Sequence, residues 1–393
     1  MRVTRLFRDF FESEKAGGLV LIVCTIISLI IANSFWGENY QAFWKGYVGS
    51  HSIEHWINDG LMATFFLLIG LELEREVYIG ELSRLKDAML PIFGAIGGMV
   101  IPAAIYLLFN YGTATQGGAG IPMATDIAFA LGILSLLGKR VPTSLKIFLT
   151  ALAVIDDLGA ILIIAFFYTG DLIWTNLFIS LGIFVVLLVL NRLKVRNLIP
   201  YLLGGVVMWY FMLHSGVHAT ITGVLVAFAI PFGNGDTKST SYILQHFLHK
   251  PVAFIILPLF ALANTAISLN GVSLNTFFEN SSLGVAFGLA VGKPIGILLL
   301  VALAVSIGIC KLPIGIKFKH IFGVGFLGGI GFTMSIFITL LAFEDQQLIS
   351  RVKFVILVSS LIAGLLGLLI LKLYLKENVV HTEMDSENLP TSS

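Results

Sequence analysis

The chain has 393 residues, of which 57% are hydrophobic and only 12% are charged, and its mean hydropathy is +0.94. This charged share is about half that of a soluble domain, so 24 Lys and Arg with 23 Asp and Glu cannot cover the surfaces of a soluble enzyme of this length. The formal net charge of +1 excludes the basic excess of a nucleic-acid-binding protein. The only two cysteines, Cys24 and Cys310, exclude a disulfide scaffold and are interpreted as packing residues. Most of the chain must therefore face lipid.

Apolar runs recur along nearly the whole chain, and a transmembrane helix needs about 20 mainly apolar residues. About twelve spans are predicted, near residues 16–35, 58–79, 88–110, 120–137, 143–169, 172–191, 198–213, 216–232, 251–269, 283–309, 321–342 and 352–376. A charged amphipathic stretch precedes the first run, which is therefore interpreted as a span and not as a cleaved signal peptide. The fold class predicted is an all-α polytopic membrane protein, with 1–376 as a single membrane-embedded domain and 377–393 as a disordered cytoplasmic tail.

The basic residues orient these spans. If the N-terminus is cytoplasmic, twenty Lys and Arg residues fall in cytoplasmic segments, and only Lys45, Arg351 and Lys353 fall on the other side. Cytoplasmic loops of membrane proteins carry such an excess. The pattern predicts an even number of spans with both ends of the chain in the cytoplasm.

Four ionisable residues fall inside predicted spans: Asp126, Asp156, Asp157 and Lys293. Each costs about 2.5–3.5 kcal/mol on insertion scales, so a functional role is the first hypothesis for each of them. Three acids and one base cannot all pair with each other, and protons or a metal cation would satisfy the excess negative charge. Neighbours on a helix point about 100° apart, so Asp156 and Asp157 are predicted to have different roles.

Two predicted spans contain helix-breaking residues. Pro122 precedes Asp126 in the fourth span, and five glycines lie between positions 323 and 331 in the eleventh. Non-helical backbone at membrane depth occurs where protein or a water-filled cavity satisfies it, although dense glycine can also serve close helix packing. Spans 3–5 and 10–12 then correspond as triplets with interrupted middle helices. Because they are offset by an odd number of spans, the second is predicted to be inverted. Asp126 and Lys293 are expected to offset the partial charges of the half-helix ends there.

Seven stretches resemble the NhaA-type sodium/proton antiporters of bacterial inner membranes, a family among those in which inverted repeats are known. The matching stretches are FFLLIGLELERE (65–76), PMATDIAFALGILSLLG (122–138), KIFLTALAVIDDLGAILIIAFFYT (146–169), SGVHATITGVLVAF (215–228), ILPLFALANTAI (256–267), GLAVGKPIGI (288–297) and GFLGGIGFTMSIFI (325–338). The resemblance implies a core of two inverted triplets and a separate panel that includes residues 36–56, where the family makes a β-hairpin used in dimerisation. It also implies a transporter that is not an enzyme and needs no cofactor.

Residue by residue, the resemblance assigns the ion site. It makes Asp157 the principal carboxylate for sodium, lithium or a proton, with Asp156 beside it and able to pair with Lys293. Thr125 and Asp126 match the crossing of the unwound chains, where the Thr125 hydroxyl can add an oxygen ligand.

A second group matches the family's cytoplasmic entrance and pH response. It consists of Glu72, Arg75, Glu76 and His218. One departure is Gln245, which stands where the family usually has an acid before the histidine of the loop after span 8. A neutral amide cannot titrate, so the pH profile is expected to differ. His246 and His249 are expected to be solvated near this loop.

The chemistry of the site favours exchange. Sodium and lithium are hard cations that prefer oxygen ligands, and only an ionised carboxylate binds them well, so protons and cations compete for the same oxygens. The resemblance implies pH-regulated, electrogenic antiport by alternating access, with more than one proton entering per sodium exported. Asp157 would carry one proton, and either Asp156 or Lys293 the other. The expected partners are sodium, lithium, protons, membrane lipid and a second copy of the chain, without nucleic acid.

Three alternatives stay open at this point. A related antiporter could move another main cation, such as potassium. A cation channel would need no proton coupling. Buried Asp and Lys residues suit a proton-coupled transporter better than a channel. An intramembrane hydrolase could use two aspartates as an acid/base pair, but adjacent aspartates on one helix are poorly placed to share a proton.

Overall fold

The computed structural model describes residues 5–269 and 274–375. Over these residues the chain is mostly helical, and its strands form one hairpin. The elements are α1 Arg5–Ala32, α2 Gly37–Lys45, β1 Tyr47–Val48, β2 His51–Ser52, α3 Ile53–His55, η1 Trp56–Leu61, α4 Met62–Tyr78, η2 Glu81–Ser83, α5 Leu85–Asn110, η3 Gln116–Met123, α6 Ile127–Ser135, η4 Gly138–Arg140, α7 Thr143–Phe167, α8 Trp174–Arg192, α9 Leu198–Leu213, α10 Ile221–Ala229, α11 Thr240–Pro251, η5 Val252–Ile256, α12 Leu257–Asn264, η6 Leu274–Phe278, α13 Asn280–Phe287, η7 Gly288–Gly292, α14 Lys293–Ser306, α15 Phe318–Gly328, α16 Phe332–Ala342 and α17 Gln346–Tyr374.

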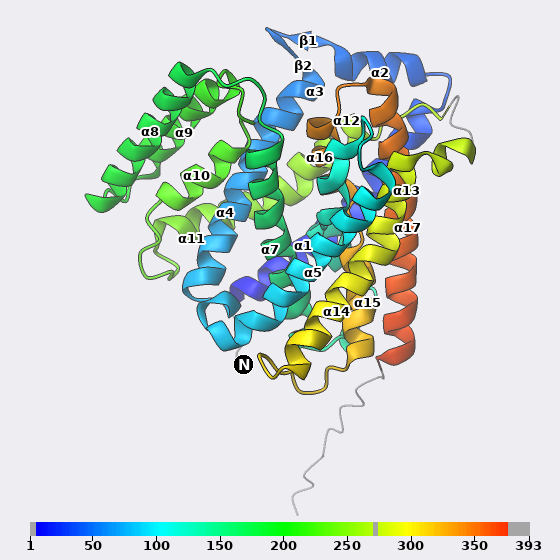
Figure 1. Cartoon of the computed structure of the whole chain (residues 1–393). Helices are drawn as coiled ribbons and strands as arrows, with labels where there is room; N and C mark the ends of the chain where they lie inside the picture. The colour runs from blue at the N-terminus through cyan, green and yellow to red at the C-terminus, as the bar shows by residue number, and fades with distance from the viewer. Residues whose placement is uncertain (1–4, 270–273, 376–393) are drawn as a thin grey trace, which may run out of the picture.

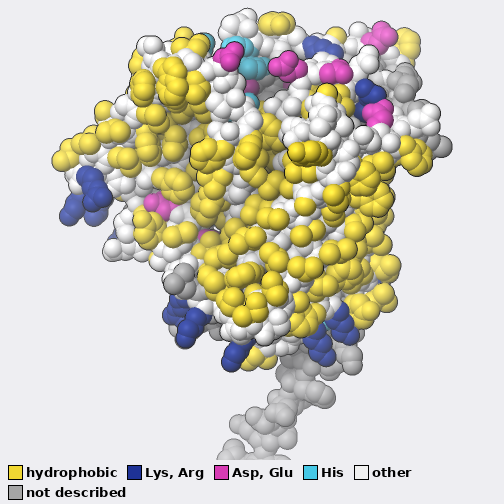
Figure 2. All heavy atoms as spheres, viewed as in Figure 1, with side chains coloured by type: hydrophobic (Ala, Val, Ile, Leu, Met, Phe, Trp, Pro, Cys, Tyr) yellow, Lys and Arg dark blue, Asp and Glu magenta, His cyan; other side chains and the backbone are white. Residues whose placement is uncertain are grey.

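Eight helices of the described chain are long and apolar enough to cross a membrane, and up to ten if each of two bent helix pairs forms one span. On the face shown in Figure 2, hydrophobic side chains cover a broad band across the middle, and most charged side chains lie at the top, at the bottom or at the left edge. A multi-pass membrane protein is therefore established. The count of twelve spans stays a prediction, as does the division into core and panel, and the predicted tail 377–393 lies outside the described residues.

Two predicted spans differ from the helices observed. In place of 216–232 the structure has only α10, whose nine residues are too short to cross a bilayer. In place of 251–269 it has one apolar stretch of helix from Thr240 to Asn264, which continues through Pro251 by means of a π-type turn. Polar residues between positions 245 and 250 hide the start of this helix from a hydropathy count.

The hairpin and α2 lie at one end of the molecule, whereas α1 begins and α17 ends at the other (Figure 1). The strands are antiparallel and pair Tyr47 with Ser52 and Val48 with His51. α2 follows α1 after a bend of 115°. The helix therefore leaves the direction of α1 and lies across the end of the bundle.

Close packing between α5 and α14 positions the centre of the molecule. A Cβ atom added to Gly97 would lie 2.1 Å from the carbonyl oxygen of Gly296, and one added to Gly296 would lie 2.1 Å from the carbonyl oxygen of Gly97. The two helices can touch only because both residues lack a side chain. Lys293 lies one turn before Gly296, so this contact brings its side chain into the bundle, where it is fully buried.

Two breaks in the helices face each other in the middle of the bundle. η3 ends at Met123 and α6 begins at Ile127, while α15 ends at Gly328 and α16 begins at Phe332 after a bend of 49°. The amide of Asp126 donates to the carbonyl oxygen of Ile330 at 2.7 Å, so one break satisfies backbone groups of the other.

Candidate functional site

The first break brings Thr125 to α7 and α14. Its hydroxyl oxygen lies 2.8 Å from Asp156 Oδ2 and 2.9 Å from the carbonyl oxygen of Gly328. Lys293 Nζ lies 2.8 Å from the same Asp156 oxygen and donates to the carbonyl oxygen of Met123. Asp156 and Lys293 are both 0% exposed, so the structure contains the predicted ion pair in a site without contact to solvent.

Asp126 has a hydrogen-bond partner on each carboxylate oxygen. Oδ1 caps the start of α6 by accepting from the amide of Phe129 at 2.9 Å. Oδ2 accepts from the amide of Thr333 at 3.0 Å and from its hydroxyl at 2.5 Å. These contacts join the first break to the start of α16.

Asp157 differs from Asp126 in its hydrogen bonding. The residue is 1% exposed, and within the described chain neither of its carboxylate oxygens has a hydrogen-bond partner. Asp156 Oδ1 is also buried without one. A buried polar group without a partner costs about 1–3 kcal/mol, and more when it is charged. These three oxygens can therefore accept a proton or help to bind a hard cation.

Three residues of the predicted entrance group, Glu72, Arg75 and Glu76, lie in the second half of α4. Glu72 and Glu74 are buried, and Glu72 Oε1 lies 3.5 Å from Nδ1 of His249. The guanidinium of Arg75 lies 5.5 Å from the ring centre of Tyr242 on α11. Glu76 follows Arg75 in the last turns of α4 and is half-buried. The structure thus brings Glu72 and Arg75 against α11.

The predicted solvation of His249 is wrong. This residue belongs to α11, is 5% exposed and lies 3.5 Å from Glu72. Gln245 is also helical and buried, not part of a loop. His246 is exposed, as expected. The helical spacing of polar residues at positions 242, 245 and 249 was the signal that could have revealed this buried face.

His218 does not join the entrance group. It lies in the turn before α10, where its Nε2 atom is 2.7 Å from the carbonyl oxygen of Tyr168. Burial lowers the pKa of His218, and the bond to Tyr168 and the charge of Asp59 only partly oppose this shift. Asp59 precedes Glu72 by 13 residues of nearly continuous helix, which corresponds to about 20 Å. The structure therefore places His218 far from the other predicted pH-response residues.

The sequence reasoning missed two hydroxyl residues at the crossing. Thr333 binds Asp126, and the Ser335 hydroxyl donates to the carbonyl oxygen of Ile121 at 2.7 Å. Both follow the glycine-rich break directly, where freed backbone groups need polar partners. Within the ranges that the structure describes, no group of three His, Cys, Asp or Glu residues is arranged to hold a metal ion. A cation at Asp157 would thus need hydroxyl or carbonyl oxygens as well.

Apolar helices that surround a buried charged cluster define a multi-pass membrane protein of the kind to which secondary transporters belong. The chain belongs to the Na+/H+ antiporter 1 family, whose model matches residues 8–371. The family is one of transporters, not enzymes.

Curated relatives cover nearly the whole chain. The Na(+)/H(+) antiporter NhaA of Flavobacterium psychrophilum is 70% identical over 98% of this chain and 100% of the relative. The protein of the same name from Cytophaga hutchinsonii is 62% identical over 96% of this chain and 97% of the relative. A solved structure of the sodium proton antiporter MjNhaP1 from Methanocaldococcus jannaschii superposes with a TM-score of 0.53 at 16% identity, covering 93% of this chain and 100% of that one. The last comparison shows a shared fold.

Proposed function

We propose that this chain exports sodium in exchange for protons, with Asp157 as the principal ion-binding carboxylate. The observation that carries the proposal is the burial of Asp157 with both oxygens unbonded among the described residues. In a medium of low dielectric constant an isolated carboxylate binds a proton or requires a cation. Because each occupant excludes the other, a site that opens alternately to the two sides of the membrane exchanges them.

The ligands for sodium would come from three side chains. Asp157 supplies two oxygens, Asp156 supplies the buried Oδ1, and Thr125 supplies a hydroxyl already within 2.8 Å of Asp156. Lithium prefers the same kind of ligand and is the second cation proposed. Asp126 and Lys293 are proposed to balance the partial charges at the crossing, since both contact backbone groups at the helix breaks.

The ion pair between Lys293 and Asp156 supports electrogenic exchange with more than one proton per sodium. A cation bound to Asp156 would compete with the ammonium group 2.8 Å away. Binding of sodium would then release a proton from Asp157 and a second one from Lys293 or Asp156. The protons return when the site faces the other side and sodium has left.

The two facing helix breaks support alternating access by inverted repeats with interrupted fourth and eleventh spans. The two facing breaks join the triplets, and α1 begins at the same end of the molecule at which α17 finishes (Figure 1). We propose that this end faces the cytoplasm of the bacterial inner membrane and that the hairpin at the opposite end contributes to a homodimer. Glu72, Arg75, Glu76 and His218 are proposed to regulate exchange by pH.

Inverted membrane vesicles with an imposed pH gradient and a fluorescent pH probe test the activity. Sodium and lithium, but not potassium, are expected to collapse the gradient in the wild type. Asp157→Asn is expected to reduce the rate at least 100-fold, because an amide cannot be ionised. Asp171→Asn, the same change at an exposed loop residue, is the matched control. Collapse by sodium in Asp157→Asn at the wild-type rate would refute the role of Asp157, and an effect of potassium alone would identify another substrate.

Lys293→Arg separates the two candidates for the second proton, because arginine keeps the charge and does not release its proton. If Lys293 is the carrier, proteoliposomes with this variant exchange sodium without generating a membrane potential. Full electrogenic exchange by the same variant would assign the second proton to Asp156.

A further inference from the structure

A cavity of about 520 Å³ lies between α2, the end of α12 and the first turns of α17, at the end of the molecule opposite the start of α1. It is separate from the Asp157 site. Most of the lining side chains are polar, and they include Gln41, Lys45, Glu54, Gln346, Arg351 and Lys353.

The lining has an excess of positive charge. Lys45, Arg351 and Lys353 face it with a single acid, Glu54. Arg351 is paired with Glu279 at 2.6 Å, so the charged lining residues together with Glu279 carry one net positive charge. All three cations of the side that the sequence predicts to be outer therefore gather at this cavity.

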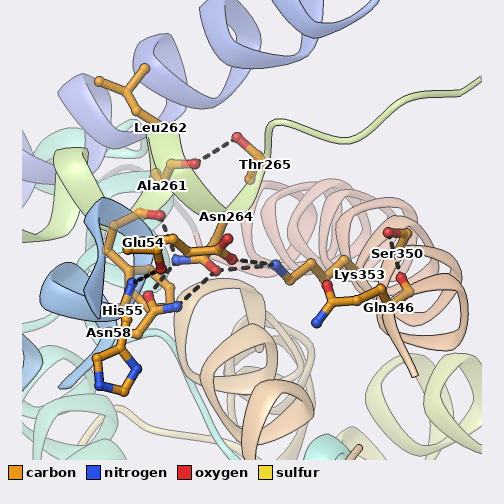
Figure 3. Close-up of polar contacts among 12 residues, drawn as sticks. Glu54, His55, Asn58, Ala261, Leu262, Asn264, Thr265, Gln346, Ser350 and Lys353 are labelled. Carbon is orange, nitrogen blue, oxygen red and sulfur yellow. Dashed lines mark hydrogen bonds and ion pairs between the residues drawn. The ribbon is translucent and has the colours of Figure 1, made fainter. Parts of the chain in front are cut away.

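The ammonium group of Lys353 has an amide oxygen as its nearest polar partner, and its ion pair is long. The residue is 6% exposed, its Nζ atom lies 3.1 Å from Asn264 Oδ1, and the nearest oxygen of Glu54 is 3.7 Å away (Figure 3). Asn264 is held in turn by Asn58, whose Oδ1 accepts from the Asn264 amide at 2.7 Å. The ammonium group is thus positioned by amides, with an acid beyond hydrogen-bond distance.

Trp44 supplies an independent sign that a ligand belongs here. The residue is 7% exposed, and its buried Nε1 atom has no hydrogen-bond partner in the described part of the chain. An indole N–H can only donate, so it requires an acceptor. The unpartnered indole donor and the excess positive charge both call for an anion with several oxygens.

The position of α2 indicates where the cavity lies in the membrane. α2 bends by 115° from α1, and the aromatic side chains of Phe35, Trp36 and Phe43 beside it are 93%, 64% and 58% exposed. Exposed aromatic residues on a short helix that lies across a bundle are typical of the headgroup level of a bilayer. Phosphate is the oxyanion that occurs at this level.

We propose that this cavity binds a phosphate group, either the headgroup of an anionic phospholipid in the outer leaflet or free phosphate. Its oxygens can accept from Lys45, Lys353 and the Trp44 indole together. An occupant of this kind would join α2 to α12 and α17 at the outer end and stabilise the fold. The proposal concerns binding by the purified protein and does not depend on transport.

Thermal unfolding of the full chain in detergent tests the proposal in two arms. One arm titrates potassium phosphate against potassium chloride at equal ionic strength, and the other titrates short-chain phosphatidylglycerol. The variants are Lys45→Gln, which changes an exposed residue at the cavity rim, and Trp44→Phe, which removes the N–H donor and makes the buried aromatic ring smaller. Lys372→Gln, an exposed lysine at the other end of α17, is the matched control.

The melting temperature of the wild type and of Lys372→Gln is expected to rise with ligand concentration. In Lys45→Gln and Trp44→Phe the same rise should need at least tenfold more ligand. A response to phosphatidylglycerol at lower concentration than to phosphate identifies the lipid as the source, and a response to phosphate alone identifies the free anion. The proposal is overturned if neither ligand stabilises the wild type, or if Lys45→Gln and Lys372→Gln change the titration equally.

Discussion

Two buried lysines, Lys293 and Lys353, have different surroundings at different depths of the molecule. Lys293 Nζ lies 2.8 Å from Asp156 in a site with 0% exposure for both side chains. Lys353 Nζ lies 3.7 Å from Glu54, which is 27% exposed, and borders a cavity. The same residue type is therefore neutralised directly in one region and only partly in the other.

The difference shows how burial determines what a charge can do. In the centre, with no solvent contact, a lysine and an aspartate must stay together or exchange a proton. At the end of the molecule that carries α2, Lys353 borders a cavity that can admit water or an anion, and the oxygen of its nearest acid is 3.7 Å away. Hence we assign proton coupling to the first region and ligand binding to the second.

Removal of the central lysine is expected to have the largest effect. Lys293→Ala leaves Asp156 buried without its cation and should lower the free energy of unfolding by about 3–5 kcal/mol. Thermal or denaturant unfolding in detergent measures this change. The double variant Lys293→Ala/Asp156→Asn should regain part of the loss because no charge remains unpaired, and an unaltered stability of the single variant would contradict the comparison.

Thr333→Val tests the support of the crossing. It removes the hydroxyl that donates to Asp126 at 2.5 Å, and a hydrogen bond to a charged group contributes about 1.5–3 kcal/mol. Thr339→Val on the same helix is the control, because its hydroxyl bonds only to the carbonyl of Ser335 one turn earlier. Equal losses of unfolding free energy in the two variants would rule out a special contribution of the Asp126 contact.

A double-mutant cycle measures the coupling free energy of the weaker ion pair, between Glu54 and Lys353. Glu54→Gln and Lys353→Gln, alone and together, are expected to give a coupling of at most about 1 kcal/mol, as for partly solvated ion pairs. Chemical denaturation in detergent provides the four free energies. A coupling of about 3–5 kcal/mol, as large as the loss expected for Lys293→Ala, would remove the distinction between the two regions.

The smallest effect is expected at His218, which lies outside both regions. Its folded-state pKa is lowered from the ordinary value of 6.5, so the unfolded chain takes up a proton first as the pH falls. His218 should therefore reduce stability progressively below about pH 6.5. The melting temperature of the wild type should decline more steeply over this range than that of His218→Gln, and parallel pH profiles would show that His218 does not contribute.

Much of the fold could be predicted because lipid imposes a simple rule on sequence. Long apolar runs at 88–110, 143–169 and 172–191 became α5, α7 and α8 with small changes at their ends. The rule failed where polar residues are buried by protein instead of lipid. Thus α11 begins at Thr240 and places Gln245 and His249 inside the molecule, against the expectation of a loop.

The candidate site divides in the same way. The residues Asp126, Asp156, Asp157 and Lys293 were evident from the sequence alone, because a charge in an apolar run is costly and therefore rare. The partner of Asp126 was not evident, since Thr333 lies 207 residues away. The pairing of Asp156 with Lys293, more than 130 residues apart, was expected only from the family resemblance. Only the tertiary structure decides which charge is paired and which is left open. That outcome depends on the approach of α5 to α14 at Gly97 and Gly296 and on two breaks that meet in space, neither of which a local pattern can encode.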